Sequence, residues 1–473
     1  MSKTVPMSEF LRGKKPQLKK LIAELNRTFS YVSILGTDVI GKTYNISSKV
    51  TSISDGRWGE RGFVARVFKD GRYYEYAFNE LPDDEKTVET ITKHIKEAFE
   101  KAAGDTFAYP QPEEQPLTKS FQDSVEILPG SIDPSKIITE LTEMNKALMG
   151  CSPLIVEAIV VVGYAHVSKI FLSAKKDLEQ SYIWSEAYLV PTARRDSVTR
   201  TIYKIHSGMM GLEILSEMKK GISIAGETVC KLLDAKPISP GEYEIICSPD
   251  AVGIIAHEAF GHGVELDMFT KNRAKAQQYI GKPVGSKLVS MHDGASAVRH
   301  VSSYLFDDEG NLGSDTVIIE NGILKAAISD AISAARLGKP ATGNGKRQKF
   351  SHKAYTRMTN TFFSPGTDKL EDMIASVKHG FLIEDAESGM EDPKDWGIQV
   401  VFTYAKEIID GKVTGNLVAP VVMTGYVPDV LSGITMVSDY FLLAGGGACG
   451  KGHKELVKVS SGGPYIKTRA RLG

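Results

Sequence analysis

The chain has 473 residues, of which 42% are hydrophobic and 24% charged, enough for two or three domains with sizeable cores. This composition excludes a disordered or collagen-like chain. The near balance of 57 basic and 58 acidic residues provides no electric field that would hold the chain on nucleic acid or on an anionic membrane, so we expect no direct nucleic-acid partner.

The first half of the chain predicts an α+β domain. Two β-favouring runs flank Asp70-Gly71, as in a hairpin, and a helix is expected after Pro82. Residues 109–116 contain three prolines and are typical of a linker, and strands are expected from Ile155 to about Tyr203. Three further stretches are expected to be helical: 8–27, 134–148 and about 211–233.

The second half predicts a mainly antiparallel β structure with a few helices. After Lys236-Pro237, strand-like runs alternate with glycine-rich turns such as Asp410-Gly411. We place the domain boundary near residue 235. The predicted fold class is therefore α+β, with an N-terminal α+β domain (1–235) and a β-rich C-terminal domain (236–473) that carries the metal-site helix described below.

The cysteines indicate a reducing environment. Cys151, Cys230, Cys247 and Cys449 are too few and too widely spaced for a disulfide framework. The first twenty residues lack the apolar stretch of a secretory signal, and the most apolar run, 154–167, is too short to cross a membrane. We therefore expect a cytoplasmic protein without a membrane segment.

One segment of the second domain carries a metal-binding pattern. Residues 242–265 read EYEIICSPDAVGIIAHEAFGHGVE, a strand followed by a helix that starts near Pro249. His257, Glu258 and His262 on this helix form the pattern HExxxH. Two neutral imidazoles can hold Zn²⁺, and an adjacent carboxylate can deprotonate a water molecule.

The spacing of the two histidines does not fit a regular helix, because five residues rotate roughly 140° past one turn. Either the helix contains an i→i+5 bulge, or it ends near Gly261 and His262 turns back in a left-handed conformation. Two such histidines are often just half-exposed helix residues. However, an uncompensated carboxylate at Glu258 on a buried helix is costly, which favours a bound cation.

A zinc site needs a third protein ligand. Several residues are candidates: Glu265, Asp267, His292, His300, His352, His379, Cys449 and His453. Cys449 is the most distinctive, because the glycines around it in LLAGGGACGKGH let the backbone approach closely and leave the sulfur accessible. The alternative is that Cys449 is a core thiol in a tight turn.

Five sequence blocks occur in a characteristic order. They are HEAFGHGVE, FDDEGNLGSDTVIIENGILKAAISD, PATGNGKRQ, RMTNTFFSPG and GGGACGKGH. In this order they resemble the TldD/PmbA family of metalloproteases, once called modulators of DNA gyrase. The resemblance covers about residue 236 to the end and is fainter before it, where RGFVARVFKDGR resembles a hairpin of the family. The chain is similar to the TldD-type subunits, which carry HExxxH and zinc, rather than to the PmbA (TldE) subunits, which lack the motif.

The resemblance implies specific roles for residues. It implies His257, His262 and Cys449 as zinc ligands, with the fourth position open to water, and Glu258 as general base. It also implies a two-domain α+β architecture and a zinc-dependent metallopeptidase that hydrolyses unfolded or short peptides in an enclosed site. The expected assembly is a homodimer or a heterodimer with a PmbA/TldE-type subunit. Residues 386–400 depart from the family's glycine-rich pattern, which bears on substrate preference and pocket shape.

Some assignments stay open at this point. Arg347, Arg357 and the backbone N–H groups of Gly445–Gly447 are candidate oxyanion donors, although each can equally be structural. The alternative to an enzyme is a non-enzymatic interaction or regulatory subunit of a TldD/PmbA-type complex, in which a metal only stabilises the fold. Direct modulation of gyrase is a weaker alternative, because the net charge of -1 gives it no electrostatic support.

Overall fold

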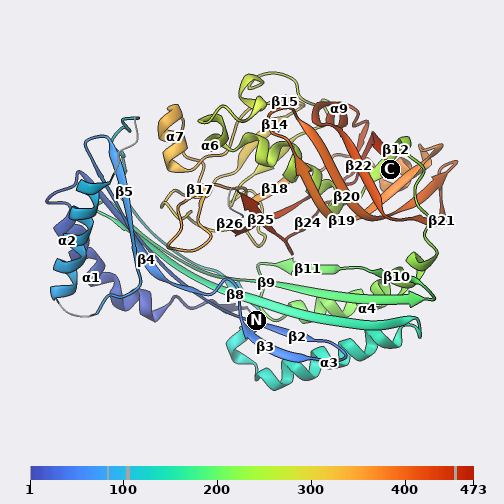
Figure 1. The fold of residues 1–473 in the computed structure, drawn as a ribbon, viewed down its shortest axis with the longest axis horizontal. Coiled ribbons are helices and arrows are strands. Elements are labelled where there is room, and N and C mark those ends of the chain that lie inside the picture. Colours follow the sequence, from blue (N-terminus) through green and yellow to red (C-terminus); the bar gives the residue numbers. More distant parts are fainter. Residues whose placement is uncertain (1, 83–84, 103–106, 452–454) are drawn as a thin grey trace.

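The first half of the chain forms a long, mainly antiparallel sheet that underlies the rest of the molecule in Figure 1. The computed structural model describes residues 2–82, 85–102, 107–451 and 455–473. The sheet has the order β10-β9-β8-β2-β4-β5, with β3 on β2 and both β6 and β11 on β9. Its strands are β2 (Tyr31–Ile46), β3 (Thr51–Asp55), β4 (Glu60–Lys69), β5 (Arg72–Phe78), β6 (Leu117–Gln122), β8 (Ile155–Ser173), β9 (Lys176–Arg195), β10 (Val198–Thr201) and β11 (Lys204–Gly208).

Helices cover this sheet in two groups. The helices are α1 (Glu9–Leu25), α2 (Glu85–Lys101), α3 (Pro134–Gly150) and α4 (Ile214–Lys231). The first two pack at one end of the sheet, where Leu18 and Ile95 share a core with Ile34 (Figure 1). The last two share a separate core with β8 and β9, to which Leu141 and Val229 contribute. Both cores are apolar, so burial of helix and sheet faces holds this half together.

The second half contains two further sheets. In the first, β12-β19-β20-β22-β28 are consecutive neighbours and β12 also pairs with β28, so these strands close on themselves. The second has the order β15-β14-β13-β18-β27-β24. The strands of the first sheet are β12 (Gly241–Cys247), β19 (His379–Glu391), β20 (Gly397–Ile409), β21 (Lys412–Val418), β22 (Val421–Tyr426), β23 (Met436–Val437) and β28 (Ile466–Leu472). Those of the second are β13 (Met291–Asp293), β14 (Thr316–Glu320), β15 (Ile323–Leu324), β18 (Asn360–Phe363), β24 (Leu442–Ala444) and β27 (Ser460–Gly463).

Helix α5 (Pro249–Ala256) runs between these two sheets, with β19 on one side and β18 and β27 on the other. Contact with a sheet on both sides explains why the helix is almost entirely apolar. A short hairpin of β25 (Ala448–Lys451) and β26 (Glu455–Lys458) completes the surroundings of the helix end. The remaining helices of this half are α6 (Leu266–Phe269), α7 (Ala331–Leu337), α8 (Leu370–Ala375) and α9 (Val427–Ser432).

The predicted α+β class is confirmed. The hairpin predicted at Asp70-Gly71 joins β4 to β5, and both turn residues have positive φ, 49° and 75°. Residues 109–116 form neither helix nor strand and lead into β6. The division at residue 235 stays a prediction, although β12 does begin soon after it. Within the described part of the chain, no helix is both long enough and apolar enough to cross a membrane.

Candidate metal centre

The HExxxH segment contains a π-helical turn. Helix α5 gives way to this turn over His257–Gly261, and the N–H of His262 donates to the carbonyl of His257, five residues back. The extra residue brings the two imidazoles together, with ring centres 5.0 Å apart and ring planes at 90°. Of the two alternatives from the sequence, the i→i+5 bulge is therefore correct, and the left-handed turn is wrong because His262 has φ −65°. Gly261 packs against Met358: a Cβ at this position would lie 2.1 Å from Sδ of Met358, so a larger residue would displace that side chain.

The structure brings Cys449 to the two histidines from the β25–β26 hairpin. Its Sγ lies 3.2 Å from Nε2 of His262, although the two residues are 187 positions apart. The candidate ligand atoms of His257, His262 and Cys449 all lie within 4.8 Å of one another. Two imidazoles and one thiolate are a donor set that suits zinc, and three protein ligands leave a fourth position for water.

The charge state of the thiol also fits a metal site. Burial on its own raises the pKa of Cys449, but the neighbouring imidazoles of His257 and His262 outweigh it and lower the pKa to about 4. The sulfur is therefore a thiolate at neutral pH, the form in which cysteine binds metals.

Glu265 orients the His262 ring. Its Oε2 lies 3.1 Å from Nδ1 of His262, and the other ring nitrogen faces Cys449. Glu265 is buried, which opposes its ionisation, but Lys451 at 2.9 Å and His262 lower its pKa to about 2. An ionised carboxylate on the far nitrogen fixes the tautomer and increases the basicity of the metal-facing nitrogen. Glu265 thus contacts a candidate ligand and does not itself join the cluster.

Arg357 holds the hairpin that carries Cys449. The guanidinium is 1% exposed. It donates to the carbonyl of Cys449 at 2.6 Å and to that of Glu455 at 2.8 Å, so it binds both strands of the hairpin. These two Nη donors are directed at the backbone that positions the sulfur, while Nε lies 4.0 Å from Oε1 of Glu265. Arg357 is therefore a positioning residue for Cys449.

The other candidate oxyanion donors contact the first half of the chain. Arg347 forms an ion pair with Glu75 of β5, with Nη1 and Oε2 2.9 Å apart. The N–H of Gly445 donates to Oγ of Ser207 at 2.8 Å. These groups join the two halves of the molecule.

The remaining candidate third ligands do not join the cluster of His257, His262 and Cys449 found among the described residues. They are Asp267, His292, His300, His352 and His379. Asp267 instead pairs with Lys451 at 2.6 Å, and His292 lies 2.7 Å from Asp315. His453 lies outside the described residues.

Glu258 follows His257 on the π-helical turn and faces strand β19. Its side chain packs so closely on Gly389 that a Cβ there would lie 2.6 Å from Cγ of Glu258. Earlier on β19, the N–H of Ala386 donates to Oδ2 of Asp250 at 2.8 Å. Strand β19 therefore follows α5 from its first turn to the metal centre.

A cavity of about 740 Å³ opens at the start of this path. Asp250, Asp385 and Ala386 line it on one side, and Lys204 and His206 of β11 line it on the other. Its volume is in the range of ligand-binding clefts. The cavity lies beside β19, and its lining does not include His257, His262 or Cys449.

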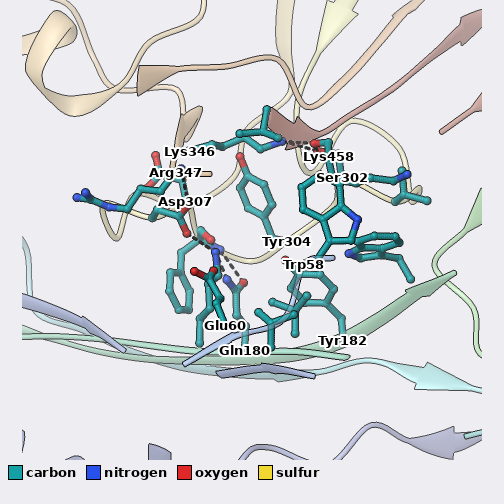
Figure 2. Close-up of a pocket in the computed structure, with 18 of the residues that line it drawn as sticks. Trp58, Glu60, Gln180, Tyr182, Ser302, Tyr304, Asp307, Lys346, Arg347 and Lys458 are labelled. Carbon is teal, nitrogen blue, oxygen red and sulfur yellow. Dashed lines mark hydrogen bonds and ion pairs between the residues drawn. The ribbon is translucent and has the colours of Figure 1, made fainter. Parts of the chain in front are cut away.

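A second, smaller cavity of about 90 Å³ lies between the long sheet and the second half of the chain (Figure 2). Lys346 reaches over it and donates to Oγ of Ser302 at 2.8 Å and to the carbonyl of Met358 at 3.1 Å. Burial, followed by the charge of Arg357, lowers the pKa of Lys346 to about 7. The cavity is too small for a peptide and adjoins the back of the hairpin that carries Cys449.

Sequence reasoning missed one carboxylate at the centre. Glu391, the last residue of β19, has both side-chain oxygens buried and no hydrogen-bond partner among the described residues. Burial raises its pKa to about 9; His262 opposes this shift and Glu258 adds to it. The one available signal was the departure of residues 386–400 from the pattern of the resembled family.

Comparison with protein-family models gives a match over residues 240–470 to the PmbA/TldA metallopeptidase C-terminal domain. A metalloprotease of Methanocaldococcus jannaschii is 32% identical over 267 residues, 56% of this chain and 58% of that protein. A zinc metalloprotease TldD homolog of Saccharolobus solfataricus is 30% identical over 295 residues, 60% of this chain and 63% of the relative. The matched region thus spans less than two thirds of the length of these relatives.

Solved structures match along almost the whole chain. A protein from Thermotoga maritima described as a candidate modulator of a DNA gyrase has a TM-score of 0.77 at 17% identity, covering 97% of this chain and 100% of its own. TldE from Thermococcus kodakarensis has a TM-score of 0.76 at 18% identity, covering 96% of this chain and 99% of its own. At these identities the likeness establishes a shared fold.

Proposed function

We propose that the chain, which matches the PmbA/TldA metallopeptidase C-terminal domain over residues 240–470, is a zinc-dependent metallopeptidase acting on unfolded or short peptides. The observation that carries the proposal is the convergence of His257, His262 and Cys449 within 4.8 Å. The similar proteins named metalloprotease and zinc metalloprotease support the same chemistry.

The proposed roles follow from the positions of the side chains. A zinc ion held by His257, His262 and Cys449 would supply Lewis-acid activation of a water molecule and of the peptide carbonyl. Glu258 would accept a proton from a water molecule in the site and return it to the departing amine. Glu265 keeps Nδ1 of His262 hydrogen-bonded, so that Nε2 remains directed at the site. This assignment makes Glu258 the general base and leaves the oxyanion donors unassigned.

The substrate class and the assembly belong to the same proposal. The cavity of about 740 Å³ beside β19 supports a substrate that binds there as an extended, unfolded chain rather than as a folded protein. We infer a dimer, formed either by two copies of this chain or with a PmbA/TldE-type subunit, in the cytoplasm. The similarity in fold to TldE supports assembly with a subunit of that type.

Glu258→Gln tests the proposal. The variant should keep near-stoichiometric zinc and lose cleavage of an unstructured protein, because glutamine fills the same space but accepts no proton. Glu371→Gln, at an exposed position on α8, is the control and should retain both properties. Cleavage retained by Glu258→Gln removes Glu258 from the mechanism. If the zinc-loaded wild type cleaves nothing, alone or with a PmbA/TldE-type subunit, the non-enzymatic alternative holds.

A further inference from the structure

A buried carboxylate beside the metal centre lacks a partner within the described chain. Both oxygens of Glu391 are buried, and none of the described residues donates a hydrogen bond to either of them. Burying a carboxylate in this way is costly unless a cation or a hydrogen-bond donor compensates it. The position of Glu391 therefore indicates a group that arrives from outside the chain.

Glu391 lies beside the proposed general base and a proposed ligand. Two residues before it on β19, Gly389 contacts Cγ of Glu258. On the other side, a Cβ at Gly263, the residue after His262, would lie 3.3 Å from Oε1 of Glu391. The carboxylate is thus next to the segment that follows His262.

The surrounding hairpin holds Glu391 in place. Glu391 pairs with Ile398 of β20, and the turn between the two strands contains Trp396, whose side chain is fully buried. The ring of Trp396 packs edge-on against Phe260 of the π-helical turn, with ring centres 5.5 Å apart. The end of the β19–β20 hairpin is therefore attached to the same turn that carries the HExxxH residues.

Neither the metal cluster nor the neighbouring cations account for Glu391. It is not a member of the cluster of ligand atoms that lie within 4.8 Å of one another. Lys451 is paired with Glu265 and Asp267, and Arg357 donates to backbone carbonyls. Lys451 and Arg357 thus have other partners. Both ring nitrogens of His262 already face Glu265 and Cys449.

We propose that Glu391 binds a primary ammonium group of the peptide substrate next to the scissile bond. An ammonium offers three donors, which suits a carboxylate with two unpartnered oxygens, and its charge favours the ionised form of Glu391 that burial alone disfavours. The ammonium comes from the peptide N-terminus or from a lysine side chain. This inference rests on the proposed peptidase function and adds a substrate preference to it.

Peptide binding to zinc-loaded Glu258→Gln protein tests the inference without any cleavage. Four fluorescent peptides with the same parent sequence are compared. Two lack lysine and differ only at the N-terminus, which is free in one and acetylated in the other. Two more are acetylated and differ at one position, which is lysine in one and norleucine in the other. Each is titrated into Glu258→Gln, Glu258→Gln/Glu391→Gln and Glu258→Gln/Asp395→Asn. Asp395 is an exposed acid in the same hairpin and controls for general charge effects.

The inference predicts that Glu391→Gln weakens binding of the peptides that carry an ammonium by about 10-fold to 100-fold, the usual effect of losing a charged hydrogen bond. Fully capped peptides should be unaffected, and Asp395→Asn should change nothing. The peptide that responds, free N-terminus or lysine, identifies the source of the ammonium. Equal loss for capped and charged peptides, or no loss, overturns the inference and leaves the peptidase proposal standing. If Glu258→Gln itself binds no peptide and the wild type cleaves none, the proposed function fails, and the inference with it.

Discussion

Replacing Arg357 with methionine is expected to weaken zinc binding although no proposed ligand is changed. Arg357 is 1% exposed and donates to the carbonyls of Cys449 and Glu455 at 2.6 and 2.8 Å. Methionine fills much of the same volume but donates nothing. Both strands of the β25–β26 hairpin therefore lose their charged donor, and Cys449 loses the contact that fixes its backbone.

The size of the effect follows from the two hydrogen bonds. Hydrogen bonds to charged groups contribute about 1.5 to 3 kcal/mol each, so losing both predicts a decrease of about 3 to 6 kcal/mol in the free energy of unfolding. Water that reaches the carbonyls reduces this figure. Removing a group that orients a metal ligand typically lowers metal affinity by about 10-fold to 100-fold, and we expect the Kd for zinc to rise by that factor.

Competition with a chromophoric chelator measures the Kd for zinc, and urea unfolding of the zinc-free protein measures stability. Arg347→Met is the matched control, because Arg347 is also buried but pairs with Glu75 of the long sheet. The control should lose stability and keep the wild-type Kd for zinc. An Arg357→Met variant that binds zinc as tightly as the wild type would refute the positioning role of Arg357.

Two further predictions follow from shifted pKa values. In zinc-free protein at pH 6, iodoacetamide should label Cys449, whose pKa is about 4, before Cys247, which is also buried and whose pKa burial raises to about 12. Zinc should protect Cys449. Peptide mass mapping that shows the reverse order would contradict this prediction. Burial, followed by the charge of Lys458, lowers the pKa of His300 to about 4, below its usual 6.5. The contribution of neutral His300 to the free energy of unfolding is therefore fully present above pH 6.5 and is lost as the pH falls towards 4. His300→Gln should therefore reduce the acid loss of stability by up to about 3 kcal/mol in urea titrations between pH 7 and 4, and an unchanged pH dependence would rule out His300 as a contributor.

Local sequence patterns predicted most of the secondary structure. The hairpin at Asp70-Gly71 and the start of α5 at Pro249 each depend on residues adjacent in sequence, so the pattern alone was sufficient. The π-helical turn was one of two alternatives, because glycines at 261 and 263 permit either backbone. The choice depends on tertiary packing: Gly261 lies against Met358, almost a hundred residues later, and no local pattern contains that contact.

The metal centre was predictable only in part, for the same reason. HExxxH is a local motif, whereas Cys449 was singled out among several candidates by its flanking glycines and by family resemblance. Glu265 was considered as a ligand and instead accepts a hydrogen bond from His262, a distinction that depends on ring orientation. The role of Arg357 depends on its contacts with the distant β25–β26 hairpin, and that of Glu391 depends on how β19 packs beside the π-helical turn, so no spacing rule could assign either role.

The zinc K-edge X-ray absorption spectrum of the zinc-loaded protein tests the central claim most directly. The account predicts two imidazole nitrogens at about 2.0 to 2.1 Å from zinc and one sulfur at about 2.3 Å from it, with a water oxygen as the fourth ligand. The sulfur contribution should disappear in Cys449→Ser and persist in Cys247→Ser, a buried thiol of the same half of the chain. A wild-type spectrum without sulfur, or a sulfur signal that survives Cys449→Ser, would contradict the assignment of His257, His262 and Cys449 as the metal site.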